Sequence, residues 1–269
     1  MSVVDAIYQR MRDDTEAVAE EATGESEVAK FYAGLSVLLT GATDLLGKCV
    51  LEKLLRDCSE LDKVYVLVRV KRGQDFQDRC NKLFADSIFD TLRKQNVNFK
   101  NKIVPMKSDL SEDNLGLSDD DRKTLTSRAQ IIFHNGSANP LDEQISVALK
   151  TNVLGTKRML ELARQCSRLK AFLFVSTAFS HCHERVVEEK FYRSPAELKT
   201  VEDMIVADEA PSGLTRDALK MLLGEWPNVF TFTKATAEEL VQQHASRASY
   251  ACCVFRPSLG RSPSPDDFL

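Results

Sequence analysis

The 269-residue chain has no apolar run close to the roughly 20 residues that a membrane-spanning helix requires. Its N-terminus also lacks the continuous apolar region of a secretory signal peptide, so we expect a soluble, intracellular chain. Basic residues are not in excess: 36 Lys and Arg against 40 Asp and Glu leave a net charge of -4. This balance argues against a nucleic-acid partner, which normally requires a basic patch.

Paired cysteines are missing as well. The seven cysteines are odd in number, and none is spaced as Cys-x-x-Cys, which favours reduced thiols over disulfides. The stretch His181-Cys182-His183 contains side chains of the kind that bind metals, but no second ligand pair has zinc-site spacing. We therefore expect no metal site.

Residues 1–30 are acidic and lack strand or core patterning, which predicts a flexible leader. A surface helix is the alternative, because Val3, Ile7 and Met11 share one weak helical face. Residues 31–269 are enough for one α/β domain with a full core, and a hydrophobic content of 43% is ordinary for a globular protein.

The segment that organises this domain is Ser36–Lys48. A short apolar run ends at Thr40, and the loop Gly41-Ala42-Thr43-Asp44-Leu45-Leu46-Gly47 leads from it into a helical pattern that reaches Leu55. A strand, a glycine turn and a helix in this order predict the first unit of a dinucleotide-binding fold.

Asp44 occupies a loop position where the pattern has glycine, which lets the backbone approach a diphosphate. A carboxylate ~5 Å from a phosphate charge, at an effective dielectric of ~20, would cost about 3 kcal/mol, or roughly a hundredfold in affinity. As a helix cap, Asp44 would instead stabilise the fold without cofactor by about 1 kcal/mol.

Five more apolar runs predict strands, at residues 63–69, 103–106, 129–134, 171–177 and 250–255. Helical spacing predicts helices at residues 45–58, 76–92, 151–165 and 230–245. Strands that alternate with helices predict a doubly wound parallel sheet of the Rossmann type, with strand order 3-2-1-4-5-6. Residues 181–226 are expected to form a long polar excursion, interrupted by Pro195, Pro211 and Gly213.

Ligands of such sheets bind beyond the carboxyl ends of the strands. The residues expected there are Gly41–Gly47, Arg69, Asp109, Asn135–Ser137 and Ser176-Thr177, with Lys234 within reach. Arg69 ends the second strand and is predicted to bind a 2′-phosphate, which favours NADPH over NADH; Lys71 and Arg72 would assist. A solvated charge at the strand end is the alternative for Arg69.

Several segments together resemble a known family. Thr40 to Gly47, Asn152-Val153-Leu154-Gly155-Thr156 and Val175-Ser176-Thr177-Ala178 resemble the extended short-chain dehydrogenases/reductases. Four further segments are similar to the alcohol-forming fatty acyl-CoA reductases: Phe31–Gly34, Asn114–Leu117, Asn228–Ala235 and Phe255–Ser258. The resemblance covers residues 31–258, whereas the family's C-terminal region is absent from this sequence.

The resemblance implies reduction of a long-chain acyl-CoA by NADPH, through an aldehyde, to a fatty alcohol. It places the hydroxyl that holds the carbonyl oxygen at Thr177, with Ser176 beside it, and the active-site lysine at Lys234. Asn152 would order the proton relay. The implied cofactor contacts are Thr40, Gly41, Thr43, Asp44, Leu45, Leu46, Gly47, Arg69, Asp109, Leu110, Gly136, Asn152, Lys234, Pro257 and Ser258. Family members associate with peroxisome or endoplasmic reticulum membranes, but this sequence has no membrane segment.

One departure concerns the proton donor. The family has a tyrosine four residues before the lysine, and this chain has Phe230 there. Loss of a positioned general acid typically costs ~10²–10⁴ in rate. Two alternatives to the reductase therefore remain open: a catalytically impaired paralogue that acts as a binding or regulatory protein, and another extended reductase or epimerase that acts on a nucleotide sugar.

Overall fold

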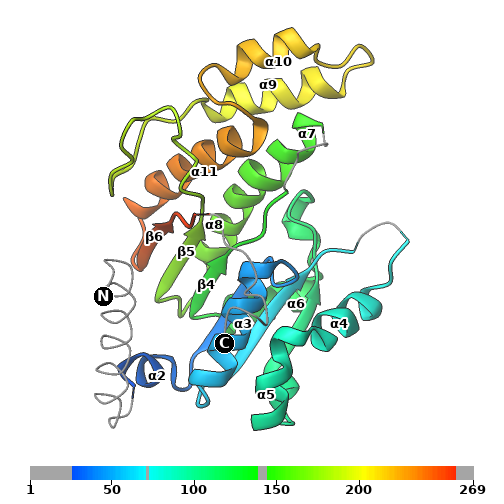
Figure 1. Ribbon diagram of the computed structural model, residues 1–269, viewed down its shortest axis with the longest axis vertical. Coiled ribbons are helices and arrows are strands. Elements are labelled where there is room, and N and C mark those ends of the chain that lie inside the picture. The colour runs from blue at the N-terminus through cyan, green and yellow to red at the C-terminus, as the bar shows by residue number, and fades with distance from the viewer. Residues whose placement is uncertain (1–25, 71–72, 139–143, 259–269) are drawn as a thin grey trace, which may run out of the picture.

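The computed structural model describes residues 26–70, 73–138 and 144–258 (Figure 1). A six-stranded sheet of parallel strands forms its centre, in the order β3-β2-β1-β4-β5-β6, which confirms the predicted fold class and strand order. The strands are β1 (Ser36–Thr40), β2 (Lys63–Val68), β3 (Ile103–Lys107), β4 (Ile131–His134), β5 (Ala171–Val175) and β6 (Ala251–Phe255). The order reverses between β1 and β4, which is the switch point where such sheets bind ligands.

Helices connect the strands and cover the sheet. The α-helices are α2 (Glu27–Tyr32), α3 (Leu45–Asp57), α4 (Phe76–Ala85), α5 (Asp90–Gln95), α6 (Asp119–Arg128), α7 (Ile145–Ala148), α8 (Gly155–Gln165), α9 (Leu198–Glu209), α10 (Arg216–Leu223) and α11 (Val229–Ala245). Short 3-10 turns are η1 (Ser87–Phe89), η2 (Phe99–Lys102) and η3 (Asp113–Gly116), and η4 (Leu149–Leu154) is a π-helix between α7 and α8.

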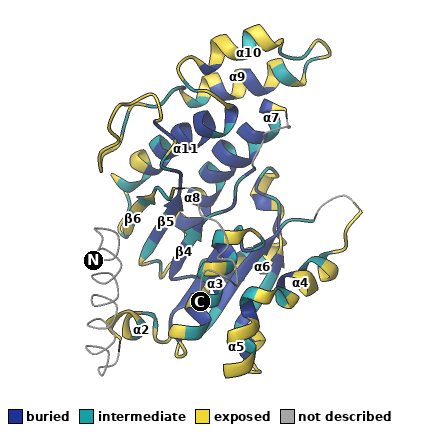
Figure 2. Cartoon of the chain, in the orientation of Figure 1, coloured by how far each residue is buried: buried dark blue, intermediate teal, exposed yellow. Residues whose placement is uncertain are grey.

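Alternate side chains of a strand point to opposite faces of the sheet, and both faces are buried. Val37 and Leu39 of β1 pack into one core with α3 and α5, whereas Leu38 packs into a second core with α8 and α11. Figure 2 shows this as a continuous buried centre of strands and inner helices. The carboxyl ends of the parallel strands meet at one edge of the sheet, where ligands of such folds bind.

The predicted helix at residues 76–92 is broken in the structure. Asp86 adopts an extended conformation, and its carboxylate accepts hydrogen bonds from the Ile88 backbone N–H at 3.1 Å and from Lys48 Nζ at 2.6 Å. The segment therefore divides into α4, η1 and α5. Apolar residues keep helical spacing both before and after Asp86, so the spacing alone could not show this break.

The polar excursion at residues 181–226 contains two helices, α9 and α10, which the sequence analysis missed. Val201, Met204 and Ile205 have helical spacing and join a third core with Phe232 of α11. Both helices lie at the far end of the molecule from α2 (Figure 1). Of the predicted leader, residues 1–25 lie outside the described residues, and residues 27–30 belong to α2.

Candidate functional site

The loop between β1 and α3 can be built only with glycine at two of its positions. Gly41 has a φ of 72°, and a Cβ atom there would lie 2.7 Å from the Gly136 nitrogen in the turn after β4. A Cβ atom at Gly47 would lie 2.1 Å from the Gly41 carbonyl oxygen. The two glycines therefore allow the loop to pack tightly against both the β4 turn and its own helix.

The first turn of α3 is open at the end of this loop. Asp44 is the N-cap residue, but its side chain is exposed and makes no cap hydrogen bond, so the prediction that it caps the free N–H groups is wrong. The first N–H groups of a helix have no partner within the helix, and together with the helix dipole they favour an anion. The loop and the helix start therefore fit the diphosphate of a dinucleotide, apart from the charge of Asp44.

An arginine that the sequence analysis missed lies over the loop. Arg79 of α4 donates a hydrogen bond from Nη2 to Thr43 Oγ1 at 3.3 Å. Arg69 follows β2 directly and is half-buried, whereas Lys71 and Arg72 lie outside the described residues. In the sequence, only the place of Arg79 on the amphipathic helical pattern after the second strand distinguishes it, and that place does not show that it reaches Thr43.

The residues after β3 and β4 form the next part of the site edge. Asp109 Oδ1 accepts hydrogen bonds from the Ser111 backbone N–H at 2.9 Å and from the Ser111 hydroxyl at 2.7 Å. Leu110 packs against Gly136, where an added Cβ atom would lie 2.9 Å from its Cδ1 atom. The turn at Asp109 is therefore held rigidly against the β4 turn.

A groove with a volume of about 1330 Å³ runs along α2 and α3. Its lining includes Leu45 and Leu46 at the start of α3, and Pro257 and Ser258 after β6. The structure thus brings four of the expected cofactor residues to one depression, although the chain separates them by more than 200 residues.

Lys234 lies at the centre of the predicted catalytic group. It is 3% exposed, and its Nζ atom donates to the Val175 carbonyl oxygen at the end of β5 at 2.6 Å. The same Nζ atom lies 4.6 Å from the centroid of the Phe174 ring. Burial lowers the pKa of Lys234 to about 7, and the nearby Glu238 carboxylate only partly offsets this effect. Phe230 precedes Lys234 by one turn of α11 and has no hydroxyl.

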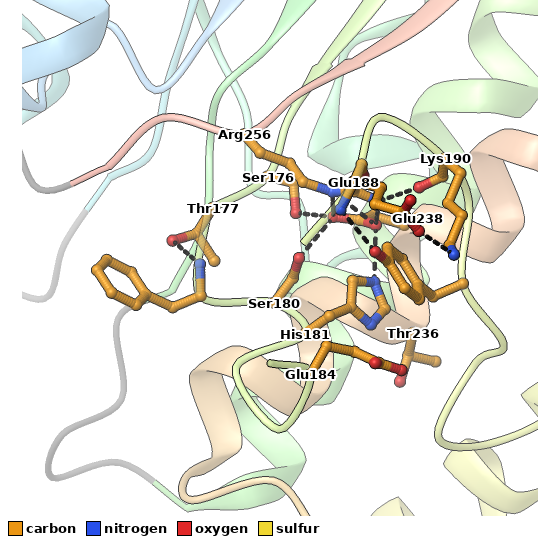
Figure 3. A network of polar contacts seen from close by, with 12 residues as sticks. Ser176, Thr177, Ser180, His181, Glu184, Glu188, Lys190, Thr236, Glu238 and Arg256 are labelled. Carbon is orange, nitrogen blue, oxygen red and sulfur yellow. Dashed lines mark hydrogen bonds and ion pairs between the residues drawn. The ribbon is translucent and has the colours of Figure 1, made fainter. Parts of the chain in front are cut away.

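The two hydroxyls after β5 have different surroundings. Backbone hydrogen bonds from Ser176 to the Phe255 carbonyl at 2.8 Å and from Ala178 to the Pro257 carbonyl at 2.9 Å hold this segment beside the end of β6. Thr177 Oγ1 accepts from the Phe179 backbone N–H at 3.3 Å, which leaves its own proton for another acceptor. Ser176 Oγ instead donates its proton to the carboxylate of Glu238 (Figure 3).

Glu238 is the centre of a buried polar network that the sequence analysis missed (Figure 3). Its carboxylate accepts from Ser180 Oγ at 2.9 Å, from His181 Nε2 at 3.0 Å and from Arg256 Nη2 at 2.7 Å. Burial acts to raise the pKa of Glu238, but the hydrogen bonds from His181, Arg256 and Ser176 outweigh it and lower the pKa to about 2. The network joins α11 to the ends of β5 and β6, one helical turn below Lys234.

Asn152 connects the β4 turn to α11. Its Oδ1 atom accepts from the Ala138 backbone N–H at 2.7 Å, and its Nδ2 atom donates to the Ala138 carbonyl at 3.1 Å and to Thr233 Oγ1 at 2.9 Å. Asn152 lies in the π-helix η4, a rare conformation that occurs frequently at functional sites. Because Thr233 directly precedes Lys234, Asn152 fixes the position of the lysine-bearing turn.

Within the described part of the chain, no helix is long and apolar enough to cross a membrane. Nor do the residues that the structure describes contain a group of three or more His, Cys, Asp or Glu side chains arranged to hold a metal ion. His181, a side chain of the kind that binds metals, bonds Glu238 through Nε2.

Comparison with known proteins identifies relatives along most of the chain. The profile of an NAD-binding family described as male sterility protein matches residues 39–264. Fatty acyl-CoA reductase 1 of Homo sapiens is 38% identical over 86% of this chain, and fatty acyl-CoA reductase 2 of Bos taurus is 37% identical over 87%. The chain spans 44% and 45% of these two relatives, which is less than half their length.

Solved structures agree with the fold. The terminal R domain from the myxalamid PKS-NRPS biosynthetic pathway matches with a TM-score of 0.58 and 26% identity, over 84% of this chain and 49% of that chain. The reductase (R) domain of a non-ribosomal peptide synthetase from Mycobacterium tuberculosis has a TM-score of 0.58 at 24% identity, covering 91% of this chain and 52% of that one. Both are reductase domains, and the second likeness concerns the fold alone.

Proposed function

The chain belongs to the NAD-binding family described as male sterility protein, and from this we propose that it is the cofactor-binding part of an NADPH-dependent fatty acyl-CoA reductase. The observation that carries the proposal is the position of Lys234, which is buried and donates to the Val175 carbonyl at the end of β5, two residues before Thr177. The relatives are named for acyl-CoA reduction, and they supply the substrate class.

The cofactor's diphosphate would lie at the open first turn of α3, over Gly41 and Gly47. Arg69 and Arg79 would bind the 2′-phosphate, because one follows β2 and the other reaches the loop at Thr43. Two guanidinium groups at this edge favour NADPH over NADH. Asp109 and Leu110 would contact the adenosine, and Pro257 and Ser258 the nicotinamide.

In the reaction, NADPH supplies the hydride that reduces the carbonyl carbon. Thr177 would hold the carbonyl oxygen, since its hydroxyl proton is not used in its bond with Phe179. Ser176 is committed to Glu238 and would act through that network rather than on the substrate. Lys234 would hold the nicotinamide ribose, and its lowered pKa of about 7 allows it to exist in both protonation states near neutral pH.

A catalytically impaired relative is the second candidate, and Phe230 is the observation that favours it. The alkoxide that forms on hydride transfer needs a proton, and the first turn of α11 offers no phenol. Asp44 adds an exposed negative charge beside the expected diphosphate. Phe230 would lower the turnover rate and Asp44 the affinity for the cofactor, so both residues favour an impaired enzyme.

The test uses cofactor binding first and turnover second. NADPH titration against NADH should show micromolar binding of NADPH and weaker binding of NADH if the proposal holds. Absence of NADPH binding, both to the unaltered chain and to Asp44→Gly, would contradict it.

Turnover is then measured with a small aldehyde, which does not depend on a binding site for a long acyl chain. We expect Phe230→Tyr in the Asp44→Gly background to raise NADPH oxidation by about 10²-fold or more. Asp44→Gly alone is the matched control, because it restores the loop without restoring the phenol. An equal rate in the single and double variants would show that another group supplies the proton.

A further inference from the structure

His134, the last residue of β4, is fully buried between two threonine hydroxyls. Its Nδ1 atom lies 2.9 Å from Thr40 Oγ1 at the end of β1, and its Nε2 atom lies 3.0 Å from Thr156 Oγ1 of α8. The ring also packs 5.6 Å from the ring of Phe174, centroid to centroid. His134 has no part in the proposed reaction.

The partners of the two threonines determine where every proton lies. Thr156 Oγ1 donates its only proton to the Asn152 carbonyl oxygen at 2.6 Å, so it must accept a proton from His134 Nε2. Thr40 Oγ1 already accepts the Gly136 backbone N–H at 2.7 Å and has its own proton free for His134 Nδ1. The imidazole is therefore neutral and carries its proton on Nε2.

Burial and charge maintain this state. Removal from water lowers the pKa of His134 to about 3, and the positive charge of Lys234 lowers it in the same direction. A neutral imidazole of fixed tautomer gives a chain of hydrogen bonds with one direction, from the Gly136 N–H through Thr40 and His134 to Thr156 and the Asn152 carbonyl.

The chain continues to the catalytic helix. The side chain of Asn152 donates to Thr233 Oγ1 at 2.9 Å, and Thr233 Oγ1 donates to the Phe230 carbonyl at 3.0 Å. Joined through Asn152, these buried and part-buried bonds thus run from the end of β1, where the glycine loop starts, to the turn of α11 that carries Lys234. We infer that neutral His134, as its Nε2–H tautomer, is a positioning residue that holds the glycine loop and the lysine-bearing helix in a fixed relation.

The effect on cofactor binding rests on the proposed function, whereas the position of the proton does not. The experiment therefore has two arms. The first is ¹⁵N NMR of histidine-labelled protein, the full chain, in which four histidines must be assigned. The second is NADPH titration of three proteins: the unaltered chain, Thr156→Val and Thr151→Val.

Thr151 provides a matched control. It is buried in η4, five residues before Thr156, and its hydroxyl has no hydrogen-bond partner. Thr151→Val removes the same atom from a similar depth without touching the network. We expect this variant to keep both the NMR signature and the NADPH affinity of the unaltered protein.

Thr156→Val removes the acceptor of the Nε2 proton. We expect the proton of His134 to move to Nδ1, where Thr40 Oγ1 can accept it, and NADPH affinity to fall by about tenfold. In the unaltered protein, His134 should remain the neutral Nε2–H tautomer from pH 8 to pH 5.

Protonation of His134 above pH 5, or an Nδ1–H tautomer in the unaltered protein, would overturn the inference, and so would an equal loss of affinity in both valine variants. If Thr156→Val changes the tautomer of His134 but not the NADPH affinity, the placement of the proton is supported and the positioning role of His134 is refuted. If no protein binds NADPH, the proposed function fails, and the NMR arm still decides the state of His134. Should Thr156→Val not fold, the unaltered protein alone provides that test.

Discussion

Glu238→Gln tests the buried network directly, because it removes one charge while it nearly preserves the shape of the side chain. Glu238 is 2% exposed, and its partner Arg256 is 15% exposed at the side chain. Glutamine keeps one acceptor oxygen but replaces the other with an amide that faces a guanidinium. We expect the half-buried Arg256 to lose its counter-charge and the fold to lose stability.

The magnitude follows from the pKa of Glu238. Its value is lowered from 4.5 to about 2, a difference of about 2.5 units, which corresponds to about 3 kcal/mol of stability at neutral pH. Breaking a buried ion pair typically costs a similar amount, about 3–5 kcal/mol. For a domain of this size the loss should lower the melting temperature by roughly 6–9 °C.

The pH dependence has a definite sign. A carboxylate whose pKa is lowered by folding contributes stability that is complete above its unfolded pKa and is lost as the pH falls through the folded value. The difference between the unaltered protein and Glu238→Gln should therefore be constant from pH 8 to pH 5.5. It should shrink as the pH falls from about 4.5 towards about 2.

The assay is urea unfolding followed by circular dichroism at pH 7, 5.5 and 3.5. The matched control is Glu239→Gln, the next residue of α11, which is only half-buried and whose carboxylate bonds Gln243. This control should stay within about 0.5 kcal/mol of the unaltered protein. A Glu238→Gln loss below 1 kcal/mol at pH 7, or a loss that persists unchanged at pH 3.5, would refute the electrostatic account.

Three further predictions concern the cofactor site. Asp44→Gly should tighten NADPH binding by about tenfold, as measured by isothermal titration calorimetry. The effect is smaller than that of removing a buried charge, because the Asp44 carboxylate is exposed to solvent. Arg79→Ala should weaken the binding of NADPH more than that of NADH, whereas Lys82→Ala, at an exposed position of the same helix, should change neither affinity. Equal losses of affinity for both cofactors would show that Arg79 does not bind the 2′-phosphate. Lys234→Met should raise the free energy of unfolding at pH 6 by about 1–3 kcal/mol, because it removes a cation whose folded pKa of about 7 lies well below 10.5. In urea titrations this gain should shrink as the pH rises above about 7 and disappear only above about 10.5.

The fold was predictable because local patterns and the global topology agree. Each strand of the sheet is a short apolar run, and the glycine loop after β1 identifies the switch point. The two helices of the excursion were missed because α9 and α10 lie among Pro195, Pro211 and Gly213, which suggested irregular chain. The helical spacing of the apolar residues Val201, Met204 and Ile205 was a stronger indication of a helix than those breakers were against it, and the structure buries all three.

The place of a residue in the fold was predictable only where position in the chain determines position in space. Thr177 follows the end of β5 and Lys234 lies on α11, as the order of strands and helices predicts, whereas their roles in the site stay predictions. Arg79 and Glu238 could not be found in this way, since each bonds a partner on a distant segment of the chain: Thr43 for one and Ser176 for the other.

The two polar networks have different physical bases, and this difference bears on how the site would tolerate the loss of its phenol. The Glu238 network is built around a buried charge, the carboxylate, and the hydrogen bonds to that carboxylate overcome the cost of burial. The His134 network is neutral, and its directions are fixed by the single proton of each hydroxyl. Both end on α11, one before Lys234 and one after it, so the lysine is held whether or not residue 230 carries a hydroxyl. A helix that is held on both sides of Lys234 is the arrangement in which Phe230→Tyr can restore a proton donor without a change in the position of the lysine.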